Sequence, residues 1–168
     1  MSLVVVQAAA ATQASRFRSS LRSPLEGVTN EAWVMFARAL EVQTAGAVSA
    51  SGGLGCYDMR ARRLVELGYA KALPQERVGE RQVQACEFLP PWTRARFLTD
   101  AAEQYLALRR SCALYDADLA TGRLSRREGL SRAGTLALLH RGGRGALLAW
   151  PDMFKDTAAL VGRCERIF

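Results

Sequence analysis

Hydrophobic side chains are spaced most regularly between residues 98 and 119. They recur there at alternating steps of three and four, which places them on one face of an α-helix. The pattern therefore predicts one continuous helix across this segment. Its apolar face consists of Leu98, Ala101, Tyr105, Leu108, Cys112, Tyr115 and Leu119.

A second helical pattern begins near residue 30. Thr29 or Asn30 can cap this helix, and Glu31 in the first turn interacts favourably with the positive end of the helix dipole. The apolar positions are Trp33, Phe36, Ala37 and Leu40. We expect the helix to end between residues 41 and 44, after burying this face against the core.

A buried central helix is predicted over residues 131–140, because positions 133–139 are apolar on nearly every side. A terminal helix is expected over residues 155–163. Residues 70–90 read as a mostly polar connection without a useful β-alternation. The expected fold class is therefore mainly α.

A glycine-rich segment separates the first two predicted helices. Residues 45–56 read AGAVSASGGLGC, a composition that resists helix and suits a loop passing close to other backbone or to a ligand. Beyond it, Asp58 can cap a short helix that runs to Leu67 and is closed by Gly68. The second helix is thus expected to start directly after the loop.

The length of 168 residues fits one globular domain, and 49% hydrophobic and 23% charged residues exclude disordered, collagen-like and disulfide-saturated chains. Residues 1–28 are small and polar and show no sustained period. We interpret them as a flexible N-terminal extension or docking arm, and residues 29–168 as a single helical domain.

The longest apolar run lies near the N-terminus, from Leu3 to Ala11. It is far shorter than the ~20 residues that span a bilayer. It also lacks a basic flank and is interrupted by Gln7, which does not fit a secretory signal. We expect no membrane span and synthesis in the cytoplasm, with any later location reached by another route of delivery.

The net charge of +7 comes from 23 basic residues, of which only Lys71 and Lys155 are lysine. Such a surface favours anionic partners, whether nucleic acid, cell-wall polymers or acidic lipid headgroups, and equally fits a solvated basic face. The segments RLSRREG and HRGGRG could contact phosphates. Aromatic residues are not interleaved with these arginines, so nucleic acid ranks last among the partners considered.

The four cysteines, Cys56, Cys86, Cys112 and Cys164, form no C-x-x-C pair and have no histidine at a metal-site spacing. We therefore predict no metal site, and nothing in the sequence indicates a cofactor. Disulfides in an oxidising compartment and buried free thiols both remain compatible with the spacing.

Two segments carry a resemblance to a known family. They are GGLGCYDMRARRLVELGY at residues 52–69, and FLTDAAEQYLALRR followed by SRAGTLALLHRGGRG within residues 97–145. Together they resemble the goose-type lysozyme and lytic transglycosylase superfamily, in particular its phage-tail and secreted muramidase-like branch. There, a helix ending in glutamate precedes a glycine-rich loop, a Gly-x-Tyr-Gln element follows, and a later buried helix ends in Ala-His-x-Gly-Gly.

The resemblance covers roughly residues 29–150 and implies a lysozyme-like helical domain with a glycine-rich loop beside the cleft. It implies that Glu41 is the general acid and base that cleaves the bond between N-acetylmuramic acid and N-acetylglucosamine in peptidoglycan glycan strands. Substrate-binding roles would fall to Tyr57, Asp58, Gly53 and Gly55. The protein would act in a virion or at the cell envelope after delivery.

From the residues alone, Glu41 follows an apolar helix face and precedes a loop able to close over it. We expect desolvation to raise its pKa by ~2, equivalent to roughly 2.7 kcal/mol. His140 at the end of the central helix is interpreted as structural, with its imidazolium near the helix carbonyls. Glu103 and Gln104 could face either solvent or the cleft.

The sequence also departs from the family pattern, because Asp58 replaces the glutamine after Tyr57, and Val42 and Gln43 follow Glu41. Asp58 could serve as a second carboxylate near the cleft or simply as a helix cap. The departures support an alternative function: a catalytically inactive lysozyme-like structural component of a phage tail or similar assembly. In that case the N-terminal extension would dock onto assembly proteins.

Overall fold

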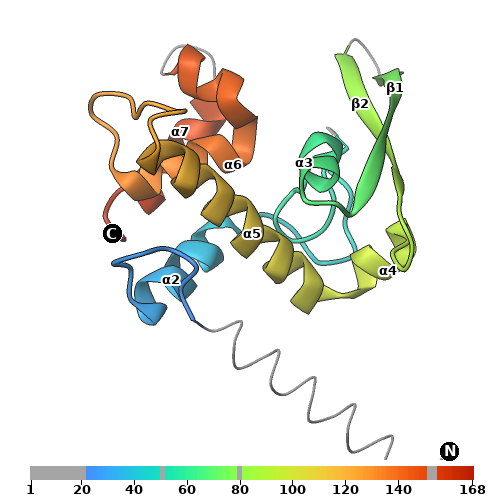
Figure 1. The fold of residues 1–168 in the computed structure, drawn as a ribbon, viewed down its shortest axis with the longest axis horizontal. Coiled ribbons are helices and arrows are strands. Elements are labelled where there is room, and N and C mark those ends of the chain that lie inside the picture. The colour runs from blue at the N-terminus through green and yellow to red at the C-terminus, as the bar shows by residue number, and fades with distance from the viewer. Residues whose placement is uncertain (1–21, 50–51, 79–80, 151–154) are drawn as a thin grey trace, which may run out of the picture.

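The structure is a computed structural model that describes residues 22–49, 52–78, 81–150 and 155–168. The described part is mainly α-helical, with one two-stranded sheet, which confirms the predicted class (Figure 1). Its elements in chain order are α2 (Asn30–Leu40), α3 (Ala61–Glu66), β1 (Ala70–Val78), β2 (Arg81–Phe88), α4 (Arg94–Thr99), α5 (Ala101–Ala120), α6 (Arg132–Ala149) and α7 (Lys155–Cys164).

Helix α5 runs through the middle of the fold, with α6 and α7 near one of its ends and α3, the hairpin and α4 toward the other (Figure 1). The core is formed where α2, α5 and the first half of α6 bring their apolar side chains together. Positions 133–139 of α6 are all buried, as predicted for a central helix. The largest buried side chains of these helices include Trp33, Phe36, Leu40, Leu108, Leu136, Leu138 and Leu139.

Helix α2 forms as its pattern predicts. The side chain of Thr29 accepts a hydrogen bond from the Ala32 backbone N–H at 3.2 Å and so caps the helix. Trp33 is fully buried, and its indole N–H donates to the hydroxyl of Tyr105 at 2.7 Å. These contacts fix α2 against α5 and thereby fix the position of its C-terminal end.

The folded part of the chain starts earlier than the predicted boundary at residue 29. Leu25 is buried in the core, and the Ser23 N–H donates to the Asn30 side chain at 2.8 Å. The segment from Ser23 to Leu25 is therefore attached to the helical domain and does not belong to the expected N-terminal extension. The rest of that prediction falls on residues 1–21, which lie outside the described residues.

The interpretation of residues 70–90 as a polar connection is wrong, because they form the antiparallel pair β1 and β2. Lys71 lies opposite Glu87, and their side chains form an ion pair at 2.9 Å. The register shifts between Ala72 and Gln75, where Pro74 has no N–H to donate. Because most side chains of this hairpin are exposed on both faces, no apolar alternation marks it in the sequence.

Three helix boundaries also differ from the prediction. The stripe over residues 98–119 is divided at Asp100, whose side chain accepts from the Glu103 N–H at 2.9 Å and caps α5. Helix α3 begins at Ala61 instead of directly after Asp58. Helix α6 continues beyond residue 140 to Ala149, across a non-helical Gly143 with φ of 68°.

Candidate functional site

Glu41 lies at the C-terminal end of α2, where the backbone leaves the helix in an extended conformation. The next residue, Val42, donates its N–H to the Cys56 carbonyl at 2.9 Å. This bond places Glu41 beside the far end of the glycine-rich loop, within electrostatic reach of Tyr57. The structure therefore brings the C-terminal end of α2 next to the end of the glycine-rich loop.

The expected desolvation of Glu41 is wrong for the structure, because its side chain is exposed. Leu40 is the last residue of the buried face of α2, and the extended backbone at residue 41 turns the following side chains outward. Val42 is exposed as well. The free protein thus presents the Glu41 carboxylate to water.

The glycine-rich loop is held in shape by its own hydrogen bonds. The Gly55 N–H donates to the Ala47 carbonyl at 2.9 Å, and the side chain of Gln43 donates to the Gly55 carbonyl at 2.7 Å. Leu54 forms isolated bridges to both Val48 and Met59. Among its described residues, the loop is therefore a folded-back turn with paired backbone.

Gln104 of α5 fastens this loop to the rest of the protein. Its side chain is fully buried, and Oε1 accepts from the Cys56 N–H at 2.8 Å. Its Nε2 donates to the carbonyls of Ala45 at 3.0 Å and Phe97 at 2.8 Å. Gln104 therefore faces neither solvent nor a cleft. Its buried side chain connects both ends of the loop to α5.

Gly53 and Gly55 pack where a side chain cannot fit. A Cβ on Gly55 would lie 2.1 Å from Oε1 of Gln104, and one on Gly53 would lie 1.8 Å from Oδ1 of Asp58. Gly55 also has a φ of 69°, in the left-handed region. Both glycines are buried, so the structure gives them a packing role, while substrate contact remains a prediction.

Gly55→Ala is expected to lower the free energy of unfolding by about 3 kcal/mol, through backbone strain and collision with Gln104. Gly122→Ala provides a matched control, because Gly122 has a φ of 73° but open space around its Cα. Strain alone should cost the control about 1 kcal/mol. Urea unfolding of both variants measures the difference, and equal losses would contradict the role of the Gln104 contact.

Tyr57 is buried, and its ring lies 6.5 Å from that of Tyr105, centroid to centroid. Burial raises the pKa of the Tyr57 hydroxyl, and the nearby Glu41 charge raises it further. The Tyr57 carbonyl lies 2.7 Å from Nε2 of His140. Two helices, α5 and α6, therefore hold this tyrosine in place beside Glu41.

His140 has the structural role that we predicted, but not as an imidazolium at a helix end. Burial lowers the pKa of His140 to about 4, so the ring is neutral at pH 7 and its Nε2–H donates to the Tyr57 carbonyl. Moreover, α6 continues past this position. The neutral histidine connects the central helix to the loop.

Asp58 is only 4% exposed, and the helix-cap interpretation of it is wrong. Its backbone has a φ of 50°, and its Oδ2 accepts from Arg60 at 3.0 Å and also from Arg141. A carboxylate held by two guanidinium groups acts as their counter-ion. Asp58 thus links the end of the glycine-rich loop to α6 instead of lying open beside Glu41.

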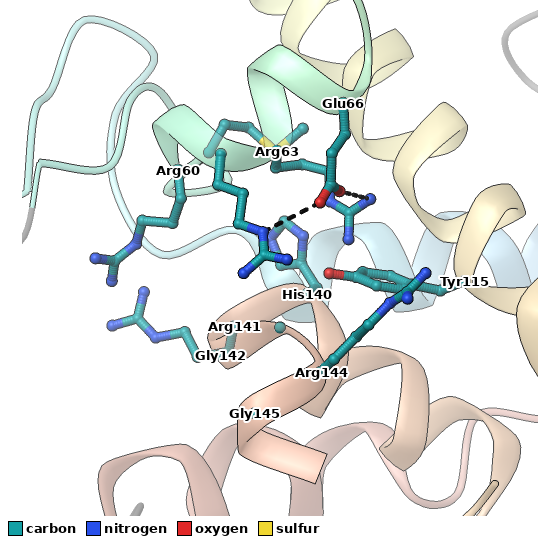
Figure 2. Close-up of a pocket in the computed structure, with 12 residues that line it drawn as sticks. Arg60, Arg63, Glu66, Tyr115, His140, Arg141, Gly142, Arg144 and Gly145 are labelled. Atoms are coloured by element: carbon teal, nitrogen blue, oxygen red, sulfur yellow. Dashed lines mark hydrogen bonds and ion pairs between the residues drawn. The ribbon is translucent and has the colours of Figure 1, made fainter. Parts of the chain in front are cut away.

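A cavity of about 470 Å³ lies next to the ion pairs of Asp58, between α3, α5 and α6 (Figure 2). Figure 2 shows side chains from α3 and α6 turned toward the same space, with Tyr115 and His140 beside them. Its lining includes five arginines: Arg60, Arg62, Arg63, Arg141 and Arg144. The HRGGRG segment is recognisably basic in the sequence, but its position opposite the arginines of residues 60–63 follows only from the fold.

The chain matches no protein-family model, and comparisons with curated proteins and with solved structures find no significant match. Within the described residues, no group of three or more His, Cys, Asp or Glu side chains could hold a metal ion. None of the described helices is both long and apolar enough to cross a membrane. The four cysteines are free thiols, and three of them are buried.

Proposed function

We propose that the protein cleaves peptidoglycan glycan strands, as a muramidase or a lytic transglycosylase, with Glu41 as general acid and base. The observation that supports this proposal is the position of Glu41 beside Tyr57, where the glycine-rich loop ends at Cys56. This is the arrangement that the sequence resemblance implies for the catalytic glutamate. Action in a virion or at the cell envelope belongs to the same proposal.

In the proposed reaction, Glu41 donates its proton to the oxygen that links N-acetylmuramic acid to N-acetylglucosamine. The resulting carboxylate then takes a proton from the attacking group. Attack by water gives a reducing end, and attack by the muramyl 6-hydroxyl gives an anhydro end. Because Glu41 is exposed in the free protein, the bound glycan itself has to displace water from the carboxyl group.

The second candidate is a catalytically inactive lysozyme-like component of a phage tail or a similar delivery assembly. Two observations favour it: Glu41 is exposed, and Asp58 is engaged by Arg60 and Arg141. Asp58 is therefore not open to act as a second carboxylate that activates water. A lytic transglycosylase can work without a second carboxylate, because groups of the substrate assist the reaction. The two candidate functions therefore differ only in whether the glycan strand is cleaved.

Clearing of purified peptidoglycan separates the two candidates. We expect the wild-type protein to clear it, and Glu41→Gln to reduce the rate at least about 100-fold, because the amide cannot donate or accept the required proton. Glu31→Gln is the matched control, since Glu31 is an exposed carboxylate at the opposite end of α2. It should retain full activity.

Mass spectrometry of the released fragments then identifies reducing or anhydro ends. Equal clearing by wild type and Glu41→Gln would remove Glu41 from the mechanism. An absence of clearing by the wild-type protein would favour the structural component.

A further inference from the structure

The cavity between α3, α5 and α6 is dominated by one sign of charge. Its lining contains five arginines and, within the described residues, a single carboxylate, Glu66 (Figure 2). Two further carboxylates approach from outside the lining as ion-pair partners, Asp58 and Asp118. In the part of the chain that the structure describes, these five arginines form ion pairs with three carboxylates, and Asp118 also pairs with Arg123, which lies outside the cavity.

The carboxylates are arranged so that each serves two arginines. Glu66 pairs with Arg63 at 2.6 Å and with Arg62 at 3.3 Å. Asp58 pairs with both Arg60 and Arg141, one from each wall. Among the described residues, the cavity lining therefore carries more guanidinium groups than carboxylates.

Arg63 shows the electrostatic cost of this arrangement. Its side chain is mostly buried, and the guanidinium lies 3.8 Å from the centre of the Tyr115 ring. Burial lowers the pKa of Arg63, Glu66 opposes that shift, and the neighbouring Arg144 and Arg62 lower it further. A bound anion would relieve this repulsion between like charges.

From this geometry we propose that the cavity binds a phosphate or diphosphate group carried by a small organic molecule. Guanidinium forks pair with phosphate oxygens in a two-point geometry, and several forks around one space suit a group with more than one negative charge. The volume of about 470 Å³ exceeds that of a phosphate ion and leaves room for an attached group beside the Tyr115 ring. The proposal goes beyond peptidoglycan cleavage and does not depend on Glu41.

Isothermal titration of the full chain with inorganic pyrophosphate at low salt tests the proposal. We expect saturable binding, weakened at least about fivefold by Arg144→Gln, because one charged hydrogen-bonding group is lost. The matched control is Arg123→Gln. Both arginines pair with Asp118 and are well exposed, 59% for Arg144 and 76% for Arg123, yet only Arg144 lines the cavity.

Both substitutions lower the net charge equally, so a difference between them reports on the cavity. Arg123→Gln should bind pyrophosphate within twofold of wild type. The proposal fails if the wild-type protein gives no binding heat, or if both variants weaken binding equally. It also fails if citrate binds as tightly as pyrophosphate, which would indicate a general anion site. Much tighter binding of a DNA duplex with the same arginine dependence would instead indicate a nucleic-acid interface.

Discussion

Gln104→Leu is expected to lower the free energy of unfolding by roughly 4 kcal/mol, the largest effect of a single substitution that we foresee. Leucine has a similar size but cannot replace the bonds to Cys56, Ala45 and Phe97. A buried backbone group that loses its partner costs about 1–3 kcal/mol. At least the Cys56 N–H and the Ala45 carbonyl lose the partner that Gln104 supplied.

Urea unfolding measures this loss, and Gln82→Leu is the matched control. Gln82 is exposed on β2, so the same chemical change there should alter stability by less than about 0.5 kcal/mol. Gln104→Glu keeps an acceptor for Cys56 but places a second acceptor against two carbonyls, and should also destabilise strongly at neutral pH. A loss below about 1 kcal/mol for Gln104→Leu would show that the loop does not depend on this anchor.

Acidification from pH 6.5 to pH 4 should remove about 3 kcal/mol of stability through His140 alone. Its pKa is about 4 in the folded protein, compared with 6.5 for an ordinary histidine. In this window the unfolded chain binds more protons than the folded one, so stability rises with pH. The contribution is complete above pH 6.5 and is lost as the pH falls toward 4.

The charged groups around His140 have opposing effects on this pKa. Burial dominates and lowers it, the Tyr57 carbonyl and Asp58 raise it, and Arg63 and Arg141 lower it. His140→Gln is the control, because its amide can donate to the same carbonyl without titrating. Urea midpoints at several pH values should show a shallower slope for this variant between pH 6.5 and 5.

Direct titration gives an independent check. His140 is the only histidine in the chain, so a single imidazole resonance reports its pKa by NMR. A measured pKa near 6.5, or equal pH slopes for wild type and His140→Gln, would contradict the predicted loss. Carboxylates contribute mainly at the acidic end of the range, which is why the comparison is made above pH 5.

Elements that bury an apolar face were predictable from the sequence. Helix α2 carries its hydrophobic residues at helical spacing, and the first half of α6 is apolar on all sides, so both positions follow from local pattern. The hairpin was not predictable in this way. Its strands are largely exposed and polar, and they are specified by pairing with each other instead of by a buried face.

The candidate site was only partly predictable, because its decisive contacts join residues far apart in sequence. Position 104 lies three residues after Ala101 and four before Leu108 on the apolar stripe, a spacing that could have indicated its burial. Its partner Cys56 could not be read from any local pattern. The same holds for Asp58 and Arg141, which are 83 residues apart.

The proximity of Glu41 to the loop was anticipated, whereas its exposure was not. Spacing along a helix predicts which face is buried, but the exposure of the residue after the helix depends on how the following chain turns. The arginine-lined cavity was also not predictable from local pattern, because its two basic segments form one site only when the fold brings α3 and α6 to the same space.

The four free thiols are distributed over four different parts of the fold: Cys56 in the glycine-rich loop, Cys86 in β2, Cys112 in α5 and Cys164 in α7. Burial raises the pKa of each, so none reacts readily as a thiolate while its surroundings stay closed. Since Cys56, Cys112 and Cys164 are buried, alkylation rates at these three cysteines measure how often their regions open. The native chain thus carries its own set of local opening probes, without any engineered label.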